Sequence, residues 1–158
     1  MHLEGDKDFS LAAGELFARL SDAKFLAHCL KNVEIVRAEA DVAEWKLRPA
    51  LSFVAGTLDI ALTIAERTAP TAMKATVFSK GIGATSTVET VLQFMPQDLG
   101  TRVHWMLDVT QLTGLLKLVP KSLMQAAALK VVEDVWGQIF EAVSHSQAPG
   151  GPEEPKTP

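Results

Sequence analysis

The chain of 158 residues has one cysteine, no tyrosine and few aromatic residues, and each scarcity excludes a class of protein. Cys29, the single cysteine, cannot form an internal disulfide, and no Cys/His spacing resembles a zinc site. Aromatic residues make up 6% of the chain, so the sequence shows no stacking platform for nucleic-acid bases. We therefore expect no metal ion, no cofactor and a cytoplasmic location.

Positive charge is also scarce. Lys and Arg number 15 against 19 Asp and Glu, a formal net charge of −4, whereas binding to phosphate backbones needs clustered cations. Residues 1–8 carry charges where a signal peptide needs an apolar run, and no uncharged stretch approaches the ~20 residues that span a bilayer. We expect no nucleic-acid partner, no secretion by this route and no spanning helix.

Hydrophobic residues make up 47% of the chain, enough for the core of one globular domain, which we place at residues 1–146. The end of the chain differs in composition. Residues 147–158 contain four prolines and two glycines and little apolar content, so they predict a disordered tail.

Apolar residues at helical spacing occur in three places. Residues 11–20 and 23–30 each carry such a stripe, preceded by the capping residues Ser10 and Asp22, and predict two short helices. A longer stripe near the end of the domain predicts a long amphipathic helix. It consists of Ala128, Val132, Val135, Trp136, Ile139, Phe140 and Val143.

Between these helices the apolar residues alternate with polar ones, which predicts β-strands covered on one face. The clearest case is residues 58–64, where we expect the four apolar side chains to face the long helix and Asp59, Ala61 and Thr63 to face outward. Similar runs at residues 73–78, 88–94 and 103–109 are separated by turns. The pattern favours an α+β fold with a curved antiparallel sheet of about seven strands around the long helix, and two short helices after the first strand.

Several short motifs resemble a known superfamily. They are the opening Leu3-Glu4-Gly5, the segment 26–30 that ends in Cys29-Leu30, the pair Gly56-Thr57, and the strand entry at residues 100–103. Together with the element order, they resemble the START-like (SRPBCC, Bet v 1-like) helix-grip superfamily, and within it the family of the carbon monoxide dehydrogenase G subunit. Lys31-Asn32 stand where that family has Pro-Gly.

The resemblance implies an accessory protein that serves a molybdenum hydroxylase-like enzyme at the membrane. Family members often continue into a membrane-attaching segment, whereas residues 149–158 here are hydrophilic. This departure argues against membrane anchoring, and the membrane contact we expect is peripheral.

The apolar face of the sheet suggests a cavity for a lipophilic small molecule, because small and polar residues interrupt it and leave room and hydrogen-bonding groups. The alternative is an ordinary filled core. The residues expected to line the cavity are Gly56, Leu58, Ile60, Leu62, Met73, Ala75, Val77, Val88, Thr90, Leu92, Trp105, Leu107 and Gln111.

An apolar segment at residues 112–124 stands where a polar connection to the long helix is expected. We expect its residues to form a gate at the cavity mouth, with Lys117 and Lys121 near an acidic lipid or an acidic partner. The alternative is that the segment folds over the core. The gate residues are Leu115, Leu116, Leu118 and Val119.

No catalytic group is predicted. His28 and Cys29 are adjacent, but neighbours on a helix point about 100° apart, and His104 and Asp108 lie ~13 Å apart along a strand. The favoured function is a noncatalytic START-like module that holds a lipid or quinone-like molecule. One alternative is a polyketide cyclase or aromatase-like enzyme, which needs His28 or a carboxylate inside the cavity; another is a chaperone-cofactor-like interaction module with a filled core.

Overall fold

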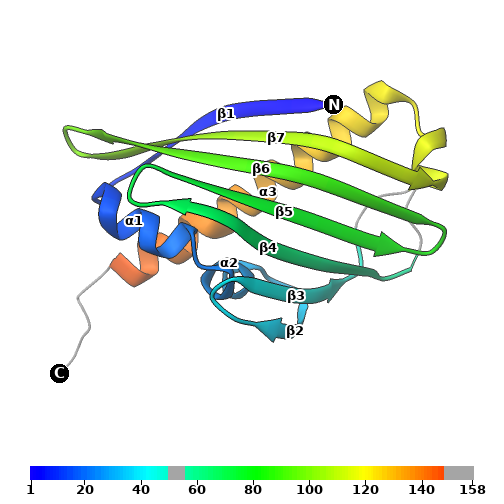
Figure 1. The fold of residues 1–158 in the computed structure, drawn as a ribbon, viewed down its shortest axis with the longest axis horizontal. Coiled ribbons are helices and arrows are strands. Elements are labelled where there is room, and N and C mark those ends of the chain that lie inside the picture. The colour runs from blue at the N-terminus through cyan, green and yellow to red at the C-terminus, as the bar shows by residue number, and fades with distance from the viewer. Residues whose placement is uncertain (50–55, 148–158) are drawn as a thin grey trace.

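The computed structural model describes residues 1–49 and 56–147. Within these residues, seven strands form one antiparallel sheet in the order β1-β7-β6-β5-β4-β3-β2 (Figure 1). This arrangement confirms the predicted helix-grip α+β fold. The elements are β1 (His2–Phe9), α1 (Ala13–Leu20), α2 (Ala23–Cys29), β2 (Glu34–Ala38), β3 (Val42–Leu47), β4 (Leu58–Thr68), β5 (Ala72–Gly81), β6 (Ala84–Gln97), β7 (Gly100–Gly114), the 3₁₀ turn η1 (Leu115–Leu118) and α3 (Lys121–Gln147).

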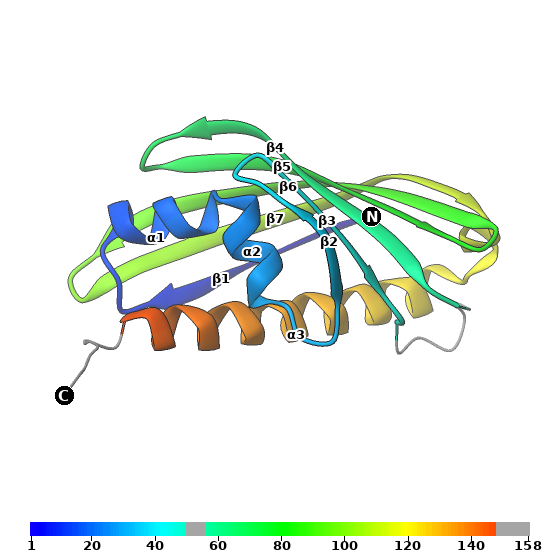
Figure 2. The ribbon, with the colours of Figure 1, turned by 90° about the horizontal axis from the view of Figure 1, so that it is seen from below.

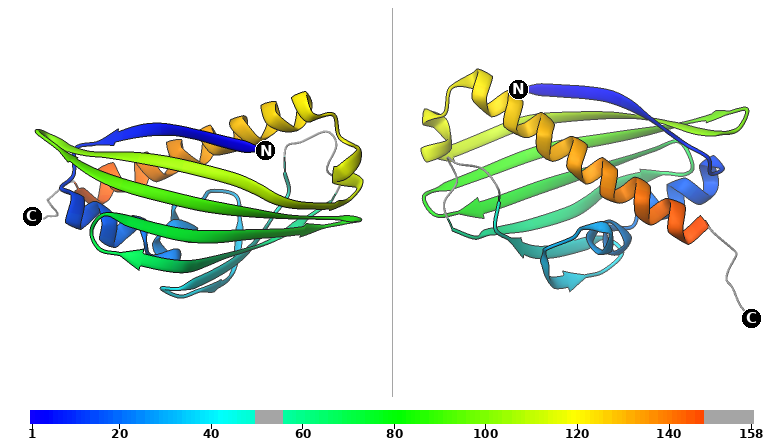
Figure 3. Two further views of the ribbon diagram at one scale, coloured as in Figure 1. Left: turned by 45° about the horizontal axis from the view of Figure 1, so that its top comes forward. Right: turned by 180° about the vertical axis from the view of Figure 1, so that it is seen from behind.

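The long helix α3 lies across one face of the curved sheet. Figure 2 shows α1 and α2 between the sheet and the C-terminal half of α3, whereas none of the described residues forms a helix beside its N-terminal half. Seen from behind, α3 crosses the strands obliquely (Figure 3). No helix in the described ranges is long and apolar enough to cross a membrane. Gln147 ends α3, and the other residues of the predicted tail lie outside the described residues.

Strand β4 has the two faces that its alternation predicts. Leu62 and Ile64 are buried on the inner face, while Asp59 and Thr63 are exposed on the outer face. The other strands share these faces, because directly paired residues lie on the same side of a sheet.

The centre of the core lies at the end of the molecule that holds α1 and α2. Leu16 and Leu20 of α1 and Val103 of β7 are completely buried there. The buried hydroxyl of Thr101 donates a hydrogen bond of 2.7 Å to the backbone carbonyl of Leu11, which ties the segment before α1 to β7. The two short helices therefore belong to the core itself.

Candidate ligand-binding site

The space between the sheet and α3 consists of two unlike halves. In the half beside α1 and α2, which we call the packed half, the inward side chains are buried: Ala43, Leu62, Ile64, Met73, Ala75, Leu92, Phe94 and Val103 of the sheet and Ile139 and Val143 of α3. In the other half, which we call the open half, the inward side chains of the sheet are only partly buried: Leu47, Leu58, Ile60, Val77, Ser79, Ser86, Val88, Thr90, Leu107 and Val109.

Helix α3 shows the same change along one stripe. Val143, Trp136 and Leu129 are seven residues apart, which is nearly two turns, so they lie on the same face of the helix. Their exposed fractions are 2%, 8% and 47%. The face that fills the packed half is therefore half exposed to solvent in the open half, and the inner surface there is accessible from outside.

All three tryptophans lie at the boundary between the two halves. Trp45 on β3 and Trp105 on β7 are buried, while the next inward residues, Leu47 and Leu107, are only partly buried. Trp136 is the first buried residue of α3. The three indoles thus form the floor of the open half.

The structure brings eleven of the thirteen predicted cavity residues onto the inner face, because the strand pairing aligns them across β4 to β7. Five of them are buried and belong to the packed half or its boundary: Leu62, Met73, Ala75, Leu92 and Trp105. Six are partly buried and lie in the open half: Leu58, Ile60, Val77, Val88, Thr90 and Leu107.

The prediction for Gln111 is wrong. A bulge in the pairing of β6 with β7 places Val88 opposite Val109 but Thr87 opposite Gln111, so Thr110 is an extra residue on β7. One extra residue reverses the alternation, and Gln111 lies on the outer face with Thr87.

The prediction for Gly56 is also wrong. Gly56 precedes β4 and has a φ of 74°, a left-handed conformation that favours glycine. A Cβ atom there would lie 3.0 Å from the Cδ1 atom of Ile82 in the turn between β5 and β6. Gly56 therefore serves a turn at the edge of the sheet, where the alternation of the following strand does not extend.

Five residues of the open half were absent from the predicted cavity: Leu47, Ser79, Ser86, Val109 and Leu129. Ser79 and Ser86 are paired across β5 and β6 and share a hydrogen bond between their hydroxyls, and Leu129 of α3 is 47% exposed. Trp45, on the boundary, was missed as well. Extending the alternation of β5 and β6 by two residues would have found Ser79 and Ser86.

The described surface also has two clefts outside this inner space. One, of about 570 Å³, has a mostly polar lining from β2 to β4 that includes Lys46 and Asp59. The other, of about 430 Å³, lies on α3 beside Lys31. Neither is lined by a predicted cavity residue, but the first includes Leu47 and so borders the open half.

The predicted gate lies at the outer end of the open half. Leu115 and Leu118 of η1 are 59% and 78% exposed, whereas Leu116 and Val119 are partly buried. The backbone N–H of Leu115 donates to the carbonyl of Gly83, which places η1 beside Ile82, itself 73% exposed. We call Ile82, Leu115 and Leu118 the apolar tip; the exposed Lys117 and Lys121 lie next to it in the sequence.

The contacts of His28 and the burial of Cys29 do not favour a catalytic role. His28 is exposed, and its Nδ1 atom lies 2.8 Å from the carbonyl of Lys24. Burial raises the pKa of the Cys29 thiol to about 12, so the thiol stays protonated and is a poor nucleophile. At the inward strand positions of the described residues there is no Asp or Glu.

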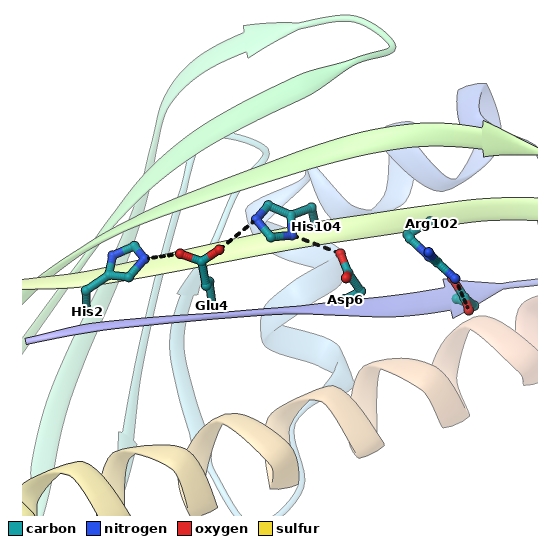
Figure 4. Close-up of polar contacts among 6 residues, drawn as sticks. His2, Glu4, Asp6, Arg102 and His104 are labelled. Atoms are coloured by element: carbon teal, nitrogen blue, oxygen red, sulfur yellow. Dashed lines mark hydrogen bonds and ion pairs between the residues drawn. The ribbon is translucent and has the colours of Figure 1, made fainter.

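Charged side chains instead gather on the outer face of β1 and β7, on the side away from α3 (Figure 4). His2 bridges Asp108 at 2.7 Å and Glu4 at 2.6 Å, and both contacts raise its pKa. His104 contacts Asp6 at 2.8 Å. His104 and Asp108 thus each bind a residue of β1, and this ladder fastens the edge strand to its neighbour.

Comparison with known proteins places this geometry in a family context. A family model described as the G subunit of carbon monoxide dehydrogenase (CoxG) matches residues 5–144. Curated proteins, by contrast, gave no match.

Solved structures share the fold at low sequence identity. A conserved protein from Geobacillus kaustophilus is 17% identical with a TM-score of 0.79, covering 92% of this chain and 97% of its own. A START superfamily protein from Mycobacterium smegmatis is 10% identical with a TM-score of 0.65, covering 91% and 97%. The protein TTHA0849 from Thermus thermophilus is 18% identical with a TM-score of 0.61, covering 94% and 100%.

Proposed function

The chain belongs to the CoxG family, named for the G subunit of carbon monoxide dehydrogenase, and from that premise we propose that it is a noncatalytic carrier of a lipophilic small molecule, lipid or quinone-like. The guest binds in the open half, between the sheet and the N-terminal half of α3. The observation that carries this proposal is Leu129, which lies on the core-facing stripe of α3 and is 47% exposed. A large apolar side chain at that position is favourable where something apolar covers it.

Apolar burial alone gives a modest affinity. Burial of apolar surface contributes roughly 25 cal/mol per Å², so a guest that buries ~200 Å² gains about 5 kcal/mol before the cost of ordering it. This gain corresponds to a dissociation constant of about 0.2 mM at best, and such weak retention suits a carrier that must also release its guest.

The apolar tip supports delivery to another surface. Leu118 and Ile82 are 78% and 73% exposed, and two lysines lie beside η1, so the tip combines apolar contacts with positive charge. This combination suits peripheral contact with an anionic membrane. The family membership extends the proposal to a molybdenum hydroxylase-like enzyme as the protein partner, and to a cytoplasmic site of action.

Binding is tested with an environment-sensitive fluorescent lipid titrated into the protein. We expect saturable binding to the wild type and its loss in Thr90→Phe, which fills the inner face of β6. Thr87→Phe is the matched control, because Thr87 lies on the outer face of the same strand and its substitution leaves the site unfilled.

Two results would contradict the carrier function. If the wild type shows no saturable binding, or if Thr87→Phe and Thr90→Phe weaken binding equally, the carrier function is rejected. The interaction module with a filled core is then the better account of the exposed apolar tip.

A further inference from the structure

Two hydrogen-bond donors at the floor of the open half have no acceptor. Trp45 and Trp105 are 7% and 3% exposed, and the Nε1 atom of each is buried without a hydrogen-bond partner among the described residues. Buried indole N–H groups usually find a partner, because an unpaired buried donor destabilises the fold. Two such groups at the boundary of one site require an explanation.

The surroundings of both indoles are apolar. Trp105 is paired with Gly5 and Leu92 across the sheet, and Trp45 is paired with Ile35 and Ile60. A buried water needs at least two polar partners, and these neighbouring side chains supply none. A carbonyl oxygen on an apolar molecule, by contrast, is satisfied by a single N–H donor.

The indole of Trp105 can occupy its position because Gly5, its neighbour on β1, has no side chain. A Cβ atom on Gly5 would lie 2.9 Å from Cζ2 and 3.1 Å from Nε1 of Trp105, so the indole rests directly on the backbone of β1. Glycine at this position gives the indole its place beside the open half.

We propose that the guest carries a neutral carbonyl oxygen, as in a ketone or an ester, and that this oxygen accepts a hydrogen bond from the indole N–H of Trp105 or Trp45. The proposal rests on the carrier function and narrows the class of guest. A pure hydrocarbon leaves both donors unpaired. A carboxylate is unsuited, because a neutral N–H does not offset the burial of a charge, and the inward cation Lys7 is already held by Glu133 at 2.9 Å.

Access to either donor requires one neighbouring side chain to move. Leu107 follows Trp105 along the inner face, and Leu47 follows Trp45; both are partly exposed. The proposed hydrogen bond therefore requires that a rotamer change at Leu107 or Leu47 opens a path from the open half to one of the two N–H groups.

The test uses two probes of the same shape. In 2-acetylnaphthalene a C=O group stands where 2-isopropenylnaphthalene has C=CH₂. The protein is labelled with ¹⁵N at its three indoles, and each probe is titrated while the indole cross-peaks are recorded. One neutral hydrogen bond predicts about fivefold to tenfold tighter binding of the ketone and a downfield shift of one indole proton.

Variants identify the donor. Trp105→Phe and Trp45→Phe each remove an N–H and keep an aromatic ring, and Trp136→Phe is the control, because its N–H is not one of the two buried donors that lack a partner. We expect the ratio of the two affinities to fall to about one in the variant that lacks the binding donor. The ratio is the readout, since the smaller ring changes the affinity of both probes alike.

The outcomes separate this inference from the carrier function. Saturable binding of both probes with equal affinity, or a ketone preference that survives loss of both donors, overturns the carbonyl inference and leaves the carrier function standing. Absence of saturable binding of both probes overturns both proposals. If a variant does not fold, the ratio of the two affinities and the shift of an indole proton in the wild type still test the inference.

Discussion

The packed half and the open half are built from the same strands and the same helix, yet only one of them is filled. The difference arises from α1 and α2, which place Leu16, Leu20, Ala23 and Ala27 between the sheet and α3 and leave all four completely buried. No comparable element enters the open half among the described residues. In this fold, stability and binding are therefore assigned to opposite ends of one continuous sheet.

The largest difference in stability is expected when a leucine is truncated to alanine in each half. We expect Leu20→Ala to lower the free energy of unfolding by about 3 kcal/mol, because it leaves a cavity in the packed half. Leu129→Ala should cost less than about 1 kcal/mol, since its side chain is already half exposed. Urea denaturation measures both. Equal losses would show that the open half is as tightly packed as the other.

A smaller effect is expected from removing one hydroxyl in each half. Thr101→Val should cost about 1–2 kcal/mol, because it leaves the buried carbonyl of Leu11 without its donor. Thr90→Val, at a partly buried inward position, should change the stability by no more than about 0.5 kcal/mol. Thermal unfolding of the two variants beside the wild type compares them directly, and a larger loss for Thr90→Val would contradict the comparison.

The smallest effect on stability is expected from His2, which lies on the outer face, away from both halves. The pKa of His2 is raised, chiefly by its hydrogen bond to Glu4 and then by that to Asp108. Its contribution to stability is fully present below the unfolded value of about 6.5, and is lost as the pH rises through the higher folded value. NMR titration should place the pKa of His2 above 6.5 and bring it closer to that value in Asp108→Asn. A pKa unchanged by this substitution would remove Asp108 from the ladder.

The sequence predicted the elements and faces wherever a strict period continued. The alternation of residues 58–64 was sufficient to assign the inner face of β4, and the 3.6-residue period was sufficient to identify α3. Gln111 and Gly56 were misplaced for a common reason. A bulge or a turn interrupts the period by a single residue, and the apolar pattern contains no sign of where the interruption occurs.

The open half was harder to predict than the fold. An inward Leu at position 62 and an inward Leu at position 129 are the same residue in the same kind of pattern, but one is 6% exposed and the other 47%. The difference depends on whether another segment of the chain fills the opposite space, and this is decided by tertiary packing. For the same reason the unpaired indole donors were not visible in the sequence.

The pairing of β1 with β7 also determines when the molecule can form. His2 pairs with Asp108, so the first strand of the chain waits during synthesis until more than a hundred further residues have been made. Contacts of such long sequence separation slow folding, and an unpaired strand is exposed to aggregation during the delay. Charges at every second position of β1, namely His2, Glu4, Asp6 and Asp8, oppose pairing with a neighbouring nascent chain. The charged side chains that fasten β1 to β7 in the finished protein thus also oppose aggregation of β1 during synthesis.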